Sequence, residues 1–113
     1  MVNRFFLDTN AIVLLLQSKA NRLLSELEQA EWIGISVISV LEFSCFSGLS
    51  PTDQVAFDRF VERVDVVDVE WANISLMDGT STLRKKYRCK LPDAIIAASA
   101  MANAATLVTA DQD

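Results

Sequence analysis

Residues 5–10 place the strongest constraint on what this chain can fold into. Residues 5–7 (Phe-Phe-Leu) form an apolar run too short for a helix of its own, and Asp8, Thr9 and Asn10 follow it directly. This pattern predicts a buried strand that delivers Asp8 at its carboxyl end. In open α/β sheets, ligands bind at that edge. The structural alternative is a turn and a helix cap, which the same three polar residues also favour.

The remainder of the chain alternates between short apolar runs and amphipathic stretches. We expect further strands near residues 33–37, 64–68 and 106–109, and helices near residues 11–16, 20–30, 40–47, 51–61, 72–87 and 93–103. Ser50, Pro51 and Asp53 form a helix-start signal with a capping serine and an acid three residues later. Strands that alternate with helices predict an α/β protein with a parallel sheet covered on both faces.

Several local patterns make narrower predictions about helix ends. Thr9 or Asn10 is expected to cap the first helix, and the end of the strand at Asp68 is expected to cap the helix that follows it. Gly48 is expected to end the third helix. The predicted helix at 72–87 has one apolar stripe, which consists of Ala72, Leu76, Gly79, Leu83 and Tyr87.

Composition excludes several classes of function. The 113 residues, 51% of them hydrophobic, predict a single domain over residues 1–113. No run is long enough to span a bilayer and no secretory signal is visible, so we expect a cytoplasmic protein without a membrane partner, with Cys45 and Cys89 as free, buried thiols. The absence of histidine excludes histidine-activated nucleophiles and histidine-ligated zinc.

Three later acids, Glu42, Asp93 and Asp111, lie like Asp8 at boundaries between apolar and polar segments. A parallel sheet could bring all four to one edge, where carboxylates about 4 Å apart repel by roughly 4 kcal/mol at an effective dielectric near 20 unless they bind cations or protons. All-oxygen ligation favours Mg²⁺ or Mn²⁺. Thr9, Asn10 and Thr109 could orient the carboxylates, or could be capping residues.

Each of these acids also has a structural explanation. Glu42 closes a Ser39-x-x-Glu42 capping box, Asp93 stabilises a helix N-terminus behind Pro92, and Asp111 suits a turn after a strand. What these explanations leave out is the shared position of the four acids at one predicted edge of the sheet.

With the acids in this order, the sequence resembles a PIN domain, specifically the small VapC-like toxin branch. The matching segments are residues 6–10 (Phe-Leu-Asp-Thr-Asn), 39–43 (Ser-Val-Leu-Glu-Phe), 91–98 (Leu-Pro-Asp-Ala-Ile-Ile-Ala-Ala) and 107–111 (Leu-Val-Thr-Ala-Asp). The four acids follow one another at spacings of 34, 51 and 18 residues, so the match spans nearly the whole chain.

The resemblance implies a three-layer α/β/α sandwich around a parallel sheet of about four strands. It also implies an endoribonuclease that depends on Mg²⁺ or Mn²⁺, forms a homodimer and is inhibited by a cognate antitoxin. Asp8, Glu42 and Asp93 match the acids most regularly associated with activity, and Asp111 matches the fourth. Asn10 and Thr109 match the accompanying polar residues. Relatives usually continue with a further short strand, whereas this sequence ends at Asp113.

Five of the ten basic residues fall within seven positions: Arg84, Lys85, Lys86, Arg88 and Lys90. In a chain of net charge −5, this basic run is the candidate surface for an RNA backbone. A solvated helix end is the alternative. Trp32 and Trp71 could stack on bases, but core or interface positions are favoured.

Two other functions compete with the nuclease. The strand that ends in Asp8 resembles phosphatases of the haloacid dehalogenase type, but that family expects a second acid at the position of Asn10. A non-catalytic protein-binding module with the same fold is the third hypothesis. Its weakness is that all four acid positions are filled.

Overall fold

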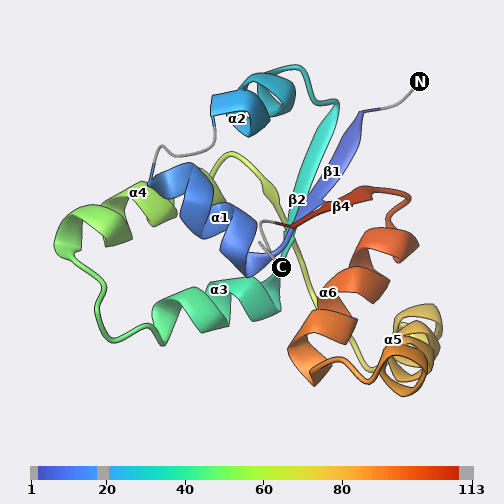
Figure 1. The fold of residues 1–113 in the computed structure, drawn as a ribbon. Helices are drawn as coiled ribbons and strands as arrows, with labels where there is room; N and C mark the ends of the chain where they lie inside the picture. Colours follow the sequence, from blue (N-terminus) through green and yellow to red (C-terminus); the bar gives the residue numbers. More distant parts are fainter. Residues whose placement is uncertain (1–2, 18–20, 110–113) are drawn as a thin grey trace.

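A four-stranded sheet lies between the helices (Figure 1). The computed structural model describes residues 3–17 and 21–109. Its strands are β1 (Arg4–Leu7), β2 (Trp32–Ser36), β3 (Asp65–Val67) and β4 (Thr106–Val108), in the spatial order β3-β2-β1-β4. All three pairings are parallel. Leu7 aligns with Ile35 on one side and with Val108 on the other, so the carboxyl ends of three strands meet at one edge.

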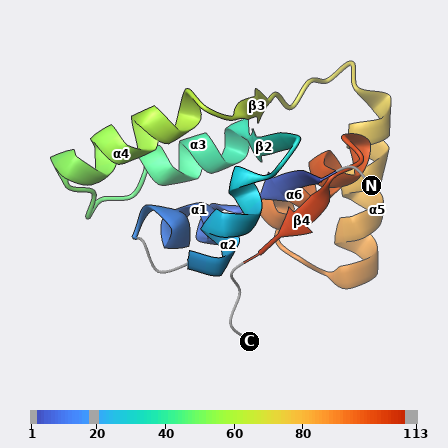
Figure 2. The same ribbon diagram turned by 90° about the horizontal axis from the view of Figure 1, so that it is seen from above.

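Helices cover both faces of this sheet. The helices are α1 (Thr9–Leu16), α2 (Asn21–Glu28), α3 (Val37–Ser44), α4 (Pro51–Val61), α5 (Ile74–Tyr87) and α6 (Leu91–Ala102). Figures 1 and 2 show α1 to α4 on one side and α5 with α6 on the other. The predicted three-layer α/β/α sandwich with a four-stranded parallel sheet is therefore confirmed for the described residues.

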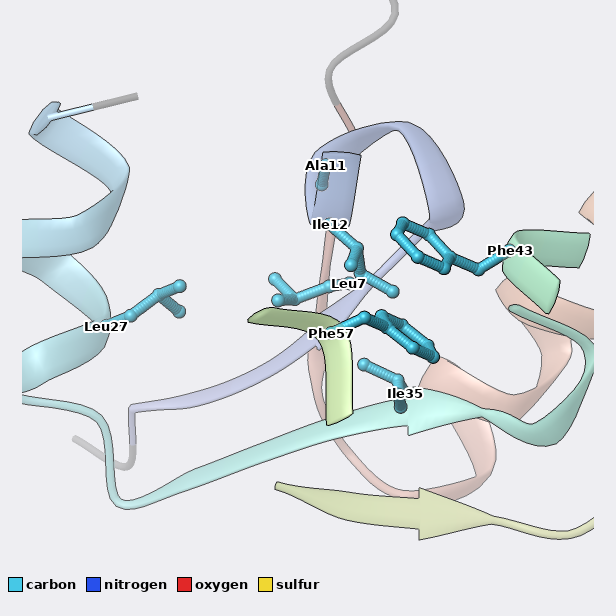
Figure 3. Packing of buried hydrophobic residues seen from close by; sticks show 7 residues of the cluster. All are labelled: Leu7, Ala11, Ile12, Leu27, Ile35, Phe43 and Phe57. Atoms are coloured by element: carbon cyan, nitrogen blue, oxygen red, sulfur yellow. The ribbon is translucent and has the colours of Figure 1, made fainter. Parts of the chain in front are cut away.

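Alternation along β1 separates two cores, because successive side chains of a strand point to opposite faces. On one face, Leu7 belongs to a buried cluster drawn from six elements (Figure 3): Leu7, Ala11, Ile12, Leu27, Ile35, Phe43 and Phe57. The rings of Phe43 and Phe57 stack there with centroids 4.0 Å apart. On the other face, Phe6 packs against Ile96 and Ala100 of α6.

Small side chains let α5 and α6 pack closely on the second face. A Cβ added to Gly79 of α5 would lie 3.6 Å from the Cβ of Ala98, which is ordinary van der Waals contact. Ala94, Ala98 and Ala100 of α6 are all buried. The two helices form the most extensive helix–helix contact in the described part of the chain.

Three predicted helix ends are wrong. Asp8 caps α1 in place of Thr9 or Asn10, because Asp8 has the extended backbone of a cap (φ −80°, ψ 173°) and accepts the Ala11 N–H. Asn73 caps α5 in place of Asp68, since the chain runs irregularly between β3 and Asn73. The third helix ends at Ser44, before Gly48.

Other local predictions are confirmed or corrected at single residues. The capping box of Ser50 and Asp53 is present in both directions. Trp32 belongs to the core, where it stacks on Phe6 and lies under the Arg4 guanidinium, whereas Trp71 is 89% exposed. Tyr87 is 63% exposed and not part of a buried stripe, because it is the last residue of α5.

No helix within the described ranges has the length and apolar character needed to cross a bilayer. Cys45 and Cys89 are free thiols, as predicted, but the expectation that they are buried is wrong: Cys45 is exposed and Cys89 is partly exposed.

Two glycine substitutions should change stability in opposite directions. A Cβ on buried Gly34 would lie 2.2 Å from the Cη2 of Trp32, and that ring is held between Phe6 and Arg4. We therefore expect Gly34→Ala to lower the free energy of unfolding by about 1–3 kcal/mol. Gly79→Ala fits its surroundings and should raise the free energy of unfolding by about 0.5–1 kcal/mol, because glycine is costly inside a helix.

Urea denaturation of both variants beside the parent protein measures the two changes. Gly79→Ala is the matched control, since the same methyl group is added at an uncrowded position. A Gly34→Ala protein as stable as the parent would show that the Trp32 ring moves aside without cost.

Candidate active site

Asp8 lies at the carboxyl end of the central strand and begins α1. Its backbone N–H donates to the carbonyl of Val108 at 3.1 Å, which joins it to the end of β4. Its Oδ1 accepts the Ala11 N–H at 2.8 Å. The capping role and the position at the sheet edge are thus both present in one residue, and the cap fixes the orientation of the carboxylate.

Glu42 projects from α3 toward the residue that follows Asp8. The N-cap of α3 is Ser36, whose Oγ accepts the Ile38 N–H at 3.0 Å, so Ser39 lies inside the helix and the predicted Ser39-x-x-Glu42 capping box is wrong. The hydroxyl of Thr9 instead donates to Glu42 Oε1 at 2.7 Å. Glu42 therefore has no role as a cap, and its one hydrogen bond within the described chain connects α3 to the start of α1.

Ser39 extends this contact into the core. Its Oγ lies 2.9 Å from the Oγ1 of Thr9, and the residue is fully buried. Because a hydroxyl has one hydrogen and Thr9 gives its own to Glu42, Ser39 supplies the hydrogen between the two hydroxyls. Ser39 is a residue of this site that the sequence patterns did not indicate. Its spacing of three from Glu42 could have identified it, because residues three apart lie on the same face of a helix.

Asp93 lies in the first turn of α6, immediately after Pro92. It is exposed, and among the described residues no hydrogen bond or ion pair reaches its carboxylate. Stabilisation by the helix dipole accounts for this position, as the structural alternative predicted. The helix that carries it contacts α3, which carries Glu42.

The remaining predicted residues have different positions. Asn10 is exposed in the first turn of α1. Thr109 directly follows Val108, whose carbonyl accepts the Asp8 N–H, so Thr109 is at the same end of the sheet. Asp111 lies outside the described residues.

A divalent metal suits the chemistry of these donors, which are carboxylates and hydroxyls. Among residues 3–17 and 21–109, however, no three acidic or cysteine side chains form a group that could hold a metal ion. The described acids alone therefore do not complete a metal centre. Whether all four acids group together stays a prediction, since Asp111 would have to contribute.

A hollow of about 300 Å³ opens beside Thr9 and Glu42, between α1, α3 and α4. Most of its lining is apolar and includes Val13, Phe46 and Leu49. Phe46 is 65% exposed. Glu42 is therefore accessible to a ligand or a partner segment from this side.

The basic run surrounds the turn that leads to Asp93. Arg84, Lys85 and Lys86 occupy the last turn of α5, where cations also favour the helix dipole, and Lys90 is the N-cap of α6. All five basic residues are exposed. In the described part of the chain, none of them forms an ion pair with a carboxylate. Their charges are thus available to an anionic ligand.

Comparison with known structures finds this fold in toxin–antitoxin complexes. Similar chains occur in a VapBC2 complex of Rickettsia felis bound to a promoter DNA fragment (25% identity, TM-score 0.73) and in a toxin–antitoxin complex of Klebsiella pneumoniae (21%, 0.77). A DNA-bound VapBC of Salmonella typhimurium is also similar (23%, 0.75). Each match covers 96% of this chain and 86–87% of the other. No curated protein matches in sequence.

The family model of the PIN domain matches residues 5–113, which include Asp8, Glu42, Asp93 and Asp111. The chain belongs to the PIN domain family, and its fold is similar to that of the VapC-like toxins.

Proposed function

We propose that this protein is a divalent-metal-dependent endoribonuclease that hydrolyses RNA phosphodiester bonds, and that it is the toxin of a toxin–antitoxin pair. The observation that carries the proposal is the hydrogen bond from Thr9 to Glu42. Thr9 directly follows Asp8, so this bond holds Glu42 near Asp8 at the carboxyl end of the sheet. Membership in the PIN domain family and the similar toxin–antitoxin complexes support a nuclease.

In this proposal Asp8, Glu42, Asp93 and Asp111 hold Mg²⁺ or Mn²⁺. When bound, such an ion supplies Lewis-acid activation of the phosphodiester. The protein's own residues set the carboxylates in place: Asp8 through its cap, and Glu42 through the hydroxyls of Thr9 and Ser39. Asn10 and Thr109 are proposed to orient the same carboxylates from α1 and from the end of β4.

The basic run is proposed to hold the RNA backbone. Arg88 gives this part of the proposal independent support. It adopts a left-handed conformation (φ 54°) at the C-terminus of α5, a position that glycine usually occupies. Such a conformation costs a non-glycine residue roughly 1–2 kcal/mol. The chain therefore keeps a cation here despite a backbone cost.

We further propose that residues 1–113 form one domain, that a cognate antitoxin binds the protein, and that two copies associate. The hollow beside Glu42, with exposed Phe46 in its lining, supports an apolar partner segment close to the acids. Leu41 of α3 is 57% exposed, which supports α1 and α3 as the surface for a second copy.

Substitution of the acids tests the catalytic assignment. We expect the parent to cleave RNA with Mn²⁺ and not with EDTA, and Asp8→Asn or Asp93→Asn to lower the rate by at least about 100-fold, since even outer partners of metal ligands are worth 10- to 100-fold. Asp78→Asn, which alters an exposed acid on α5, is the matched control. Cleavage of a labelled RNA gives the rates, and calorimetry gives Mn²⁺ affinity.

Three results would contradict this assignment. Folded Asp8→Asn and Asp93→Asn proteins that cleave like the parent would reject these acids as catalytic. A folded parent that never cleaves RNA would favour the protein-binding module. Trapping of a phosphorylated Asp8 would favour the phosphatase.

The hydroxyl of Thr9 should act through Glu42. Thr9→Val keeps the shape of the side chain but removes the donor, so the Glu42 carboxylate loses its anchor and buried Ser39 loses its partner. We expect kcat to fall about 10- to 100-fold with little change in KM. Thr9→Ser restores the donor and should recover most of the activity. If valine and serine variants have equal kcat, Thr9 does not position Glu42.

Arg88→Gly should have opposite effects on stability and on RNA binding. Relief of the left-handed strain, less the entropy cost of glycine, should stabilise the fold by roughly 0.5–1 kcal/mol. Loss of one phosphate contact should weaken RNA binding and lower the slope of log affinity against log salt by about 0.7. Ala104→Gly is the control, because Ala104 is also left-handed (φ 52°) but carries no charge.

Thermal unfolding and a salt titration of RNA binding measure the two effects. Ala104→Gly should be stabilised with an unchanged salt slope. An unchanged slope in Arg88→Gly as well would assign Arg88 to a solvated helix end.

A further inference from the structure

We infer that Tyr87 is a stacking platform for an unpaired RNA base, at the turn that leads to Asp93. The inference rests on the proposed nuclease function and narrows its substrate class. It specifies RNA with at least one unstacked base near the cleaved bond.

Tyr87 is placed on the surface although its sequence position suggests the core. It ends α5 on the apolar stripe of that helix, where Leu76 is buried and Leu83 half-buried. Tyr87 itself is 63% exposed, and within the described chain its hydroxyl forms no hydrogen bond. The ring therefore contributes little to the core, and much of its flat apolar surface remains exposed to a ligand.

Lys86 covers part of the Tyr87 ring. Its Nζ lies 5.3 Å from the ring centroid, a cation–π distance. This contact occupies one face of the ring and leaves an exposed remainder for a second flat group. It also places the positive charge of Lys86 next to the ring. A nucleotide whose base stacks on the ring would therefore have a cation nearby for its phosphate.

The charge around Tyr87 selects a nucleic acid over other ligands of an exposed aromatic. Arg84, Lys85, Arg88 and Lys90 flank the ring in sequence and are all exposed. Aromatic rings interleaved with cations are how proteins bind single-stranded nucleic acid, because every base has a stacking face and every nucleotide a phosphate. A base inside a duplex already has both faces stacked and cannot use the ring.

Trp71 provides the contrast within the same chain. It is more exposed than Tyr87, at 89%, and it precedes the opposite end of α5. Its neighbours in sequence include Asp68 and Glu70, both exposed acids that repel phosphate. Trp71 is thus the more exposed ring, but the residues around it are acidic. The residues around Tyr87 are basic, and for this reason Tyr87 is the candidate platform.

The turn between α5 and α6 joins the platform to the candidate active site. Only Arg88, Cys89 and Lys90 separate Tyr87 from α6, whose first turn contains Asp93. Figure 1 shows this turn running directly into the N-terminus of α6. A base stacked on Tyr87 would therefore belong to a nucleotide close to the Asp93 carboxylate.

Binding of a fluorescein-labelled RNA tests the inference without any need for cleavage. Anisotropy is measured in EDTA with a short single strand and with the same strand annealed to its complement. We expect Tyr87→Ala to weaken single-strand binding by roughly tenfold and duplex binding by less than about twofold. Tyr87→Trp should retain single-strand affinity, and Trp71→Ala, the matched control, should bind like the parent.

Each outcome either supports or overturns the platform. Unchanged single-strand affinity in Tyr87→Ala overturns it, and so does an equal loss for single strand and duplex. Competition by a polyglutamate peptide as strong as that by unlabelled RNA would also overturn it, because the surface would then belong to an acidic protein.

Failure of the proposed function is a separate result. A parent that binds single strands through Tyr87 but never cleaves them with Mn²⁺ keeps the platform and rejects the nuclease. If the parent cleaves RNA and Tyr87→Ala has the same cleavage rate and the same RNA affinity, the nuclease proposal stands and the stacking platform is rejected.

Discussion

Parallel pairing of β1 with both β2 and β4 is the constraint on which the rest of the structure depends. Because all the strands point the same way, their carboxyl ends meet at one edge, and α1 and α3 begin there directly after β1 and β2. The Asp8 N–H, bonded to the Val108 carbonyl, fixes the edge at atomic level. Residues from the two ends of the chain become neighbours by this pairing alone.

Hydrogen bonds orient two carboxylates at this edge, those of Glu42 and Asp8. Thr9 stands between buried Ser39 and exposed Glu42 and links the core to the surface. A carboxylate on an exposed helix face would otherwise sample many rotamers, at an entropy cost to any ligand that needs one of them. The hydrogen bond from Thr9 restricts the Glu42 side chain already on folding, so a ligand does not have to restrict it on binding. The Asp8 carboxylate is oriented in the same way by its cap.

The α5–α6 turn contains two features that do not favour local stability. Arg88 occupies a strained backbone position, and Tyr87 exposes a ring that would be stabilising if buried. Neither feature contributes to the core, and both lie among unpaired cations in the described chain. A protein of net charge −5 thereby presents one basic, aromatic surface next to Asp93.

The sequence by itself determined the alternation of strands and helices, the three-layer architecture and the positions of Asp8 and Asp93 at the beginnings of helices, because hydrophobic period and capping chemistry are local. It also allowed a Ser39-x-x-Glu42 capping box as an alternative role for Glu42, and it placed Tyr87 on the apolar stripe of its helix. The structure contradicts both, because local patterns do not reveal which side chains come close in space. Only the tertiary structure decided those two cases. It set Glu42 against Thr9 across two helices, and it left the ring of Tyr87, the last residue of α5, in solvent. Long-range pairing of β1 brings such residues together, and no local property of the chain encodes that contact.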